Sequence, residues 1–156
     1  DTFIRIGTAG KLSAPAHEAG VNGVICTGSV RDEGTTGQYI PYEYPAMADR
    51  HIVDALAKAA KARGYHFLEG IVHSKDAFYG QIDPEGLPNG EMLKMRWDMW
   101  KKSRVLASEM ETAALFVISS IRDCRAGAIL SFQSMRQSME VALDALKDII
   151  ERDKQD

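Results

Sequence analysis

Two glutamates in the segment Ser108-Glu109-Met110-Glu111 are of a residue type that could bind a polar ligand, and apolar segments lie on both sides of them. Residues 105–107 are expected to form a buried strand, and residues 110–121 an apolar helix. A helix start carries unpaired N–H groups and a partial positive charge, which favour an exposed acid by roughly 0.3–1 kcal/mol. The place where a strand gives way to a helix also commonly opens into the ligand crevice of an α/β fold. The two glutamates therefore either stabilise a helix start or bind a ligand.

An arginine and a threonine near the beginning of the chain could bind phosphate. Residues 2–10 alternate as in a short strand and then break into a glycine-bearing turn, with Arg5 in the strand and Thr8 in the turn. A guanidinium matches two anionic oxygens at once, and a threonine hydroxyl and loop N–H groups would add donors. The alternative is an arginine of an edge strand that points into water. The glycine spacing is not a Walker motif, which requires a Gly-Lys-Ser/Thr ending.

A third polar segment follows the strand expected over residues 66–73. It contains Phe78, whose ring could stack on a planar ligand, and Gln81, whose amide offers a donor and an acceptor side by side. These groups suit a cyclic imide or amide edge such as that of a pyrimidine. The alternative interpretation of Phe78 and Tyr79 is that they are core residues, which is the commoner role of such side chains. His73 is expected to be a hydrogen-bonded histidine at a strand end and not a metal ligand.

Strands and helices are expected to alternate along most of the chain. Further strands are predicted over residues 21–30 and 125–132, and helices over residues 50–63, over residues 91–102 and over a closing apolar pattern from Met139 to Ile150. Residues 31–37 are expected to be a polar loop, and the tyrosine-rich residues 39–45 an ordered loop that covers the core or lines a pocket. Asp49 is expected to cap the first helix and Gly64 to end it. This alternation predicts a three-layer α/β domain.

Composition restricts the class of protein. The 156 residues are 45% hydrophobic and 26% charged, which fits one globular domain, and the net charge of −3 without a basic cluster argues against nucleic acid as a partner. No apolar run approaches the roughly 18 residues of a membrane span, and no leader pattern is present, so a cytoplasmic protein without membrane contact is expected. Cys26 and Cys124 lack the spacing of a metal site and are expected to be buried free thiols.

The three polar segments occur together, and in one order: Arg5-Ile-Gly-Thr-Ala-Gly10, Ser74-Lys-Asp-Ala-Phe-Tyr-Gly-Gln81 and Ser108-Glu-Met-Glu-Thr-Ala-Ala-Leu-Phe116. In this combination the chain, from residue 2 to about residue 131, closely resembles the nucleoside phosphorylase superfamily and, within it, the uridine phosphorylases. The resemblance implies a three-layer α/β/α domain with a central mixed sheet over residues 1–156. The N-terminal portion of the family domain, with its glycine-rich phosphate loop, has no counterpart before Asp1, so a partial domain is expected.

The resemblance also implies a role for each motif residue. Arg5 and Thr8 would hold phosphate, while Met110 would lie against the ribose and Glu111 would bind the ribose hydroxyls, with Glu109 as an acid that supports this region. Gly10 would lie against the base, Phe78 would stack on it and Gln81 would hydrogen-bond its edge. Arg5 and Glu111 are the expected catalytic residues. No metal and no organic cofactor are expected, and inorganic phosphate would be the co-substrate.

The implied reaction is the phosphorolysis of uridine to uracil and ribose 1-phosphate. The sugar develops oxocarbenium character while the base leaves with negative charge, as in glycosidases, but the nucleophile is phosphate from solution. The protein would therefore act by positioning and by electrostatic stabilisation. Family members assemble as dimers or as hexamers of dimers with shared sites, so a homo-oligomer is expected. The helix over residues 91–102, rich in Met and Trp, and the tyrosine loop are candidate contact surfaces.

Three departures from the family pattern keep other interpretations open. Uridine phosphorylases often have an arginine two positions after the glutamine, where this chain has Asp83, and an anion cannot bind a uracil carbonyl. The aspartate that follows the last strand in related purine enzymes is absent at Ser131-Phe132, which favours a pyrimidine, and the loop that follows is short. The alternatives are a nucleoside phosphorylase or nucleosidase of another base specificity, and a catalytically inactive homologue that binds a nucleoside.

Overall fold

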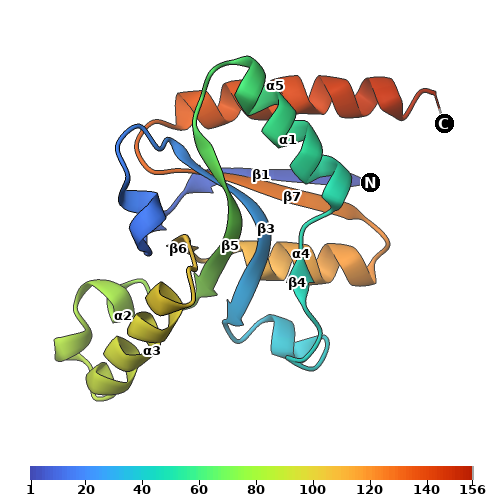
Figure 1. Cartoon of the computed structure of the whole chain (residues 1–156). Helices are drawn as coiled ribbons and strands as arrows, with labels where there is room; N and C mark the ends of the chain where they lie inside the picture. The colour runs from blue at the N-terminus through green and yellow to red at the C-terminus, as the bar shows by residue number, and fades with distance from the viewer. Residues whose placement is uncertain (156) are drawn as a thin grey trace.

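The computed structural model describes residues 1–155, in which strands alternate with helices as the sequence predicts (Figure 1). The strands are β1 Thr2–Thr8, β2 Gly10–Lys11, β3 Gly23–Asp32, β4 Ala46–Met47, β5 Phe67–Lys75, β6 Ala107–Glu109 and β7 Arg125–Ser131. The α-helices are α1 Arg50–Ala62, α2 Tyr79–Ile82, α3 Gly90–Lys102, α4 Thr112–Ile121 and α5 Met135–Arg152. Three short 3₁₀ turns are η1 Ala14–His17, η2 Thr36–Gln38 and η3 Pro84–Gly86.

The strands form one mixed sheet in the order β1-β7-β3-β5-β6-β2, with β4 paired to β3. β1 runs parallel to β7, and β3, β5 and β6 run parallel to one another, whereas the β7–β3 and β6–β2 pairs are antiparallel. The predicted central mixed sheet is therefore confirmed. Because β3, β5 and β6 are parallel, their carboxyl ends at Asp32, Lys75 and Glu109 meet at the same edge of the sheet.

Helices cover both faces of the sheet, which confirms the predicted three layers (Figure 1). On one face α1 and α5 pack on β3 and β7, through fully buried side chains such as Ile52, Leu56 and Val141. On the other face α4 places Phe116 and Val117 against the sheet. Each such side chain stabilises the fold by about 1.5–3 kcal/mol when it leaves water. The helices α2 and α3 lie together at the far end of the molecule, beside β5 and β6.

The predicted ends of helix α1 are confirmed. The Asp49 carboxylate accepts hydrogen bonds from the backbone N–H groups of His51 and Ile52, at 2.9 and 3.2 Å. Gly64 follows the helix with a φ of 69°, a left-handed conformation that glycine adopts without strain. The helix therefore starts and stops where its capping residues require.

Some predicted boundaries are wrong, and the reason is the same for each. Strand β3 continues through Asp32 into the predicted loop, and β5 continues through Lys75, because these polar ends still pair with each other in the sheet. The predicted strand at 105–107 is β6 at Ala107–Glu109, and the helix begins at Thr112. Pairing with a neighbouring strand, which periodicity does not report, decides where each strand ends.

Predictions about the surface are confirmed in part. Cys26 is a buried free thiol as expected, but Cys124 is partly exposed. Trp97 of α3 is buried in a small cluster with Leu12 and Val105, whereas three methionines of the helix are exposed: Met92, Met95 and Met99. The loop between β7 and α5 is short, as the sequence suggests: β7 ends at Ser131 and α5 starts at Met135.

The tyrosine loop both covers the core and lines a hollow. Tyr44 packs against the core, while Tyr39 and Tyr42 are exposed. The guanidinium of Arg31 holds the loop, since it donates to the backbone oxygens of Ile40 and Pro41 and lies 4.9 Å from the Tyr42 ring. Tyr42 and Tyr44 line a second pocket beside residues of β3, β4 and β5, and none of the three predicted motifs contributes to it.

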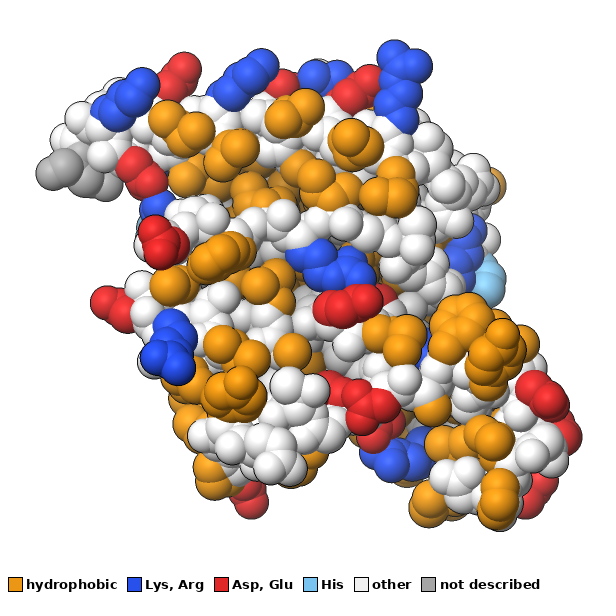
Figure 2. Space-filling model, turned by 180° about the vertical axis from the view of Figure 1, so that it is seen from behind, with side chains coloured by type: hydrophobic (Ala, Val, Ile, Leu, Met, Phe, Trp, Pro, Cys, Tyr) orange, Lys and Arg blue, Asp and Glu red, His pale blue; other side chains and the backbone are white. Residues whose placement is uncertain are grey.

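A further apolar surface lies on α5, where the sequence analysis did not place a contact surface. Seen from behind, hydrophobic side chains gather beneath the charged rim of this helix (Figure 2). The exposed apolar side chains of α5 are Met135, Met139, Leu143, Leu146 and Ile150. The inner side of the same helix packs on α1 and the sheet.

Candidate active site

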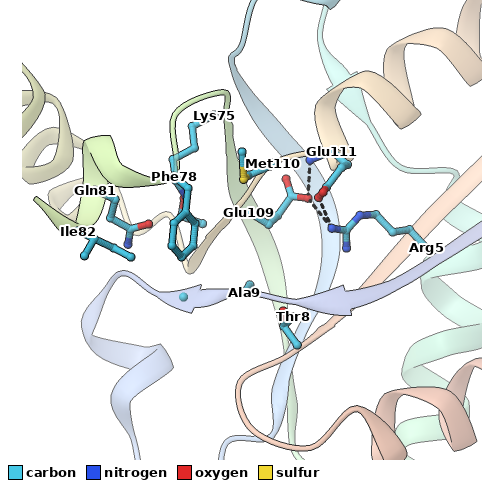
Figure 3. Close-up of a pocket in the computed structure, with 12 residues that line it drawn as sticks. Arg5, Thr8, Ala9, Lys75, Phe78, Gln81, Ile82, Glu109, Met110 and Glu111 are labelled. Atoms are coloured by element: carbon cyan, nitrogen blue, oxygen red, sulfur yellow. Dashed lines mark hydrogen bonds and ion pairs between the residues drawn. The ribbon is translucent and has the colours of Figure 1, made fainter.

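One cavity of about 370 Å³ brings the three predicted motifs together (Figure 3). It lies where the end of β1 and the turn to β2 face the carboxyl ends of β5 and β6. Its lining residues are Arg5, Thr8, Ala9, Gly10, Lys75, Phe78, Gln81, Ile82, Ser108, Glu109, Met110 and Glu111. All eight residues that the sequence predicts for a site are among them. The three motifs, which are far apart in the sequence, therefore line the same cavity.

Arg5 lies at one end of the cavity, with both glutamates. Its Nη2 donates a hydrogen bond to the Glu111 carboxylate and lies 3.5 Å from Oε2 of Glu109. The Arg5 side chain is mostly buried, which contradicts the alternative of an edge-strand arginine in water. Its Nη1 is also buried and has no hydrogen-bond partner among residues 1–155. The guanidinium therefore has an unused donor, and Arg5 itself lines the cavity.

A glycine lets the Arg5 side chain fold back along β1. A Cβ atom placed on Gly7 would lie only 2.0 Å from Nη1 of Arg5. Any side chain at this position would therefore push the guanidinium out of its present place. Gly7 is therefore required for the close approach of the Arg5 side chain to the backbone of β1.

Glu109 is the anchor of the corner between β6 and α4. Its side chain is only 1% exposed, and its carboxylate accepts hydrogen bonds from the Ser74 hydroxyl and from the backbone N–H groups of Glu111 (2.9 Å) and Thr112 (2.9 and 3.1 Å). The Ser74 hydroxyl in turn accepts from the N–H of Ala113 at 2.9 Å. Glu109 therefore satisfies the free N–H groups at the start of α4, as the helix-start interpretation predicts, and also faces Arg5.

Glu111 has the opposite character. Its side chain is 61% exposed at the cavity wall, where a ligand can reach the carboxylate. Burial raises the pKa of Glu111, but the hydrogen bond and the positive charge of Arg5 outweigh burial and leave the pKa below its usual value. Glu111 is therefore an ionised acceptor near neutral pH. The two glutamates of one motif have divided roles, one structural and one open to ligand.

The other end of the cavity has an aromatic ring and an amide. Phe78 is 52% exposed and lines the cavity, so the alternative that it is a core residue is wrong, and Tyr79 is exposed as well. Gly10 faces the Gln81 side chain, since a Cβ on Gly10 would lie 3.5 Å from Nε2 of Gln81. Figure 3 shows Phe78 and Gln81 together, on the side of Met110 away from Arg5. The cavity therefore has a charged end and a flat, amide-bearing end.

A buried polar network lies behind this second end. His73 is hydrogen-bonded at the end of β5, as expected, through Nε2 to Asp32 at 2.8 Å and through Nδ1 to the Ser108 hydroxyl at 3.2 Å. Lys75 Nζ donates to the same Ser108 oxygen at 2.7 Å. Asp32 also accepts from Arg96 of α3. The network ties the ends of β3, β5 and β6 to the helix that covers them.

Asp32 holds this network through its charge. Burial raises its pKa, but the hydrogen bond from His73 and the charge of Arg96 outweigh burial, so the pKa is lowered. A lowered folded pKa adds stability above the unfolded pKa of about 3.9, and that stability is lost as pH falls through the folded value. We expect Asp32→Asn to reduce the free energy of unfolding by roughly 1–3 kcal/mol at pH 7 and by progressively less below pH ~4.

Urea unfolding of Asp32→Asn and of the parent protein, from pH 7 to pH 3, measures the difference in their free energies of unfolding. Asp98→Asn is the matched control, because Asp98 lies on the exposed side of α3 and pairs with Lys101 only at the surface. A constant difference between Asp32→Asn and the parent from pH 7 to pH 3 would contradict a contribution from the Asp32 charge.

Four residues of the cavity were missed by the sequence analysis: Ala9, Lys75, Ile82 and Ser108. Each lies inside or directly beside a predicted motif. Lys75 had a usable signal, because it is a charged residue at the end of an apolar strand, between Ser74 and the aromatic segment. Asp83, in contrast, is exposed and does not line the cavity. Among residues 1–155, no group of three His, Cys, Asp or Glu side chains could hold a metal ion.

Comparison with known proteins decides the family. Residues 1–152 match the model of the phosphorylase superfamily. The chain belongs to this superfamily. Over 129 residues it is 45% identical to a uridine phosphorylase of Treponema pallidum, an alignment that covers 83% of this chain and 49% of the relative. It is 36% identical over 170 aligned positions to a uridine phosphorylase of Thermococcus kodakarensis, which covers 99% of this chain and 60% of the relative.

The relatives differ in the base that their names specify. A guanosine phosphorylase of Halorubrum lacusprofundi is 35% identical over 129 residues, which cover 83% of this chain and 48% of the relative. Membership in the phosphorylase superfamily therefore does not by itself specify a pyrimidine. The chain spans about half to three-fifths of the length of these curated relatives. No helix in the part of the chain that the structure describes is long and apolar enough to cross a bilayer.

Proposed function

We propose that this protein is a uridine phosphorylase, which converts uridine and phosphate reversibly to uracil and ribose 1-phosphate in pyrimidine salvage. One observation carries the proposal: the arginine, the Glu-Met-Glu segment and the Phe-Gln pair line one cavity of about 370 Å³. That volume suits a small ligand with one charged end and one flat end. Relatives that are named uridine phosphorylase are up to 45% identical to this chain, which also supports the proposal.

The charged end suits phosphate and ribose. Arg5 would bind phosphate through its guanidinium, and the Thr8 hydroxyl would add a further donor, since both residues line the cavity. Glu111, ionised and exposed, would accept hydrogen bonds from the ribose hydroxyls, with Met110 against the sugar. Glu109 would keep Glu111 and Arg5 in place, because its carboxylate accepts a hydrogen bond from the Glu111 N–H and pairs with the Arg5 guanidinium. This order sets phosphate and sugar side by side.

In the proposed reaction the protein forms no covalent bond to the substrate. A phosphate oxygen forms a bond to C1′ while the C1′–N bond breaks, and the electron pair of that bond leaves on the base. Gly10 would allow the base to approach, Phe78 would stack on it and Gln81 would hydrogen-bond its edge. Positioning and electrostatic stabilisation would supply the rate enhancement. The proposed reaction uses no metal and no organic cofactor, and phosphate is the co-substrate.

Ultraviolet-monitored cleavage by the full-length protein tests this proposal. The substrates are uridine, thymidine, inosine and guanosine, each with and without phosphate. Phosphate-dependent cleavage of uridine with little cleavage of inosine or guanosine is the expected result. Preference for a purine would support the second candidate, a phosphorylase of another base specificity, which the guanosine phosphorylase relative favours. Binding of uridine without cleavage would identify an inactive homologue.

Replacement of Glu111 tests the ribose contact. Glu111→Ala is expected to lower kcat/KM for uridine by about 10²-fold, because a contact that strengthens with the oxocarbenium charge is lost. Glu111→Gln should recover part of the rate, since the amide still accepts one hydrogen bond. Steady-state kinetics measure both variants, with Glu43→Ala in the exposed tyrosine loop as the control. Near-normal turnover of Glu111→Ala would remove this residue from the mechanism.

We propose a homo-oligomer, a dimer or a hexamer with sites shared between subunits, in the cytoplasm and without nucleic acid or membrane partners. The exposed apolar side chains of α3 and α5 are the support for an oligomer, because contiguous exposed apolar surfaces are typical of protein interfaces. Light scattering of the full-length protein measures the subunit number.

A further inference from the structure

Lys75 is a buried lysine in the wall of the cavity. It is the last residue of β5, its exposed fraction is 7%, and it lines the cavity with Phe78 and Gln81. Figure 3 shows it beside Phe78 and Met110, at the end of the cavity away from Arg5. Burial lowers the pKa of Lys75, while the charges of Glu109 and Glu111 partly oppose that effect. A lysine in such a place is costly unless its ammonium group has acceptors.

The structure gives this ammonium fewer acceptors than it can use. Its three N–H groups have one hydrogen-bond acceptor among residues 1–155, the Ser108 oxygen at 2.7 Å. The nearest aromatic face is that of Trp97, with Nζ 5.6 Å from the ring centroid. Two donors of a nine-tenths buried cation therefore lack protein acceptors. A ligand acceptor in the adjoining cavity would satisfy them.

The network behind Lys75 fixes it as a donor. Asp32 has a lowered pKa and is ionised, so Nε2 of His73 donates to it. The other ring nitrogen, Nδ1, is hydrogen-bonded to the Ser108 hydroxyl at 3.2 Å. The Ser108 oxygen also accepts a hydrogen bond from Nζ of Lys75 at 2.7 Å, because an ammonium group can only donate. The chain of hydrogen bonds from Asp32 holds Nζ of Lys75 at the cavity wall.

In the described part of the chain, Lys75 is the cation at the flat end of the cavity. The positively charged residues that line the cavity are Arg5 and Lys75, and Arg5 is engaged with two carboxylates at the other end. Asp83, at the position where the resemblance suggests an arginine, does not line the cavity and is an acid. Among residues 1–155, Lys75 is therefore the cation that negative charge on a departing base would meet at this end.

We propose that Lys75 donates a hydrogen bond to a carbonyl oxygen of the departing pyrimidine and stabilises the negative charge of that ring. This inference rests on the proposed phosphorolysis and names the residue that makes the base a better leaving group. As the C1′–N bond breaks, its electron pair spreads over the ring onto the carbonyl oxygens, where the ammonium hydrogen bond strengthens. The released base then takes its proton from water, and Lys75 keeps its own. Asp32, His73 and Ser108 act as positioning residues for Lys75.

The test compares two leaving groups in the full-length protein. Lys75→Met removes the ammonium and keeps a side chain of similar length, and it should lower kcat/KM for uridine by about 10²-fold. With 5-fluorouridine, whose base carries negative charge more readily, the loss should be several-fold smaller. Loss should appear mainly in kcat, because the contact strengthens as charge develops. Lys102→Met, at the exposed end of α3, is the control and should match the parent.

A loss in Lys75→Met of equal size for both substrates, or no loss, would overturn the assignment of Lys75. Lys75→Gln keeps a donor to Ser108 without the charge, and it should show the same dependence on the leaving group; it also replaces Lys75→Met if that variant does not fold. Protection of the variant against thermal unfolding by inorganic phosphate reports that the Arg5 end is intact. Failure of the parent protein to cleave uridine with phosphate would instead reject the proposed function, and the role of Lys75 with it.

Discussion

Arg5→Ala is expected to lower kcat/KM for phosphorolysis of uridine by about 10²–10³-fold, the usual effect of removing one preorganised donor from a charged transition state. Nη2 of the guanidinium faces two carboxylates, and its Nη1 is a buried donor without a partner among residues 1–155. The KM for phosphate should rise more than the KM for uridine. Steady-state kinetics in which phosphate and uridine are varied separately measure both constants.

Two further variants sharpen this test of Arg5. Arg5→Lys should recover little activity, because an ammonium is a point charge and cannot replace a planar fork with five donors. Arg50→Ala is the matched control, since Arg50 is an exposed arginine whose carboxylate partner is at the surface of α1. Circular dichroism of Arg5→Ala verifies that the fold is retained. Turnover close to that of the parent protein would mean that Arg5 does not bind the reacting phosphate.

Glu109→Ala is expected to cause the largest loss of stability, roughly 3–5 kcal/mol of the free energy of unfolding. The buried carboxylate satisfies the Ser74 hydroxyl and two backbone N–H groups at the start of α4, and it faces Arg5. Alanine would leave the Ser74 hydroxyl and the two N–H groups without this acceptor, and Arg5 with Glu111 as its remaining carboxylate partner. Urea unfolding monitored by circular dichroism measures the difference.

Glu109→Gln separates the hydrogen bonds from the charge. The amide keeps one oxygen acceptor and nearly the same shape, so about half of the loss should remain. Glu91→Ala is the control, because Glu91 is exposed in the first turn of α3 and pairs only with a surface lysine. If Glu109→Ala unfolded with the same midpoint as the Glu91 variant, the corner between β6 and α4 would depend on other contacts.

Local pattern predicted much of the fold. The helix α1 has its cap at Asp49 and its stop at Gly64, and each signal acts within a few residues, so it is visible in the sequence. The apolar strands and the alternation with helices predicted the α/β class for the same reason. The ends of β3, β5 and β6 were misplaced, because polar residues there are held by pairing with strands distant in the sequence.

The sequence analysis predicted the candidate site as three motifs but missed some of the residues that line it. Residue type made Arg5, Gln81 and Glu111 candidates, and the resemblance to the nucleoside phosphorylases gave each of them its expected role. Lys75 and Ser108 were missed, because a lysine and a serine have many roles, and only their neighbours give them one. The core interpretation of Phe78 was wrong because hydrophobicity alone does not tell whether an aromatic ring faces the core or a cavity.

The amino-acid sequence by itself determined the chemistry that this protein can offer, a guanidinium, two carboxylates, an amide and an aromatic ring on an α/β scaffold. The tertiary structure alone decided which of these groups meet. Arg5 and Glu111 are 106 positions apart and form an ion pair, because β1 and β6 bring their ends to one cavity. It also decided that Glu109 is buried and Glu111 open, and that Lys75 rather than Asp83 reaches the flat end. Strand order and register set these distances, and both depend on pairing energies between segments that no local pattern contains.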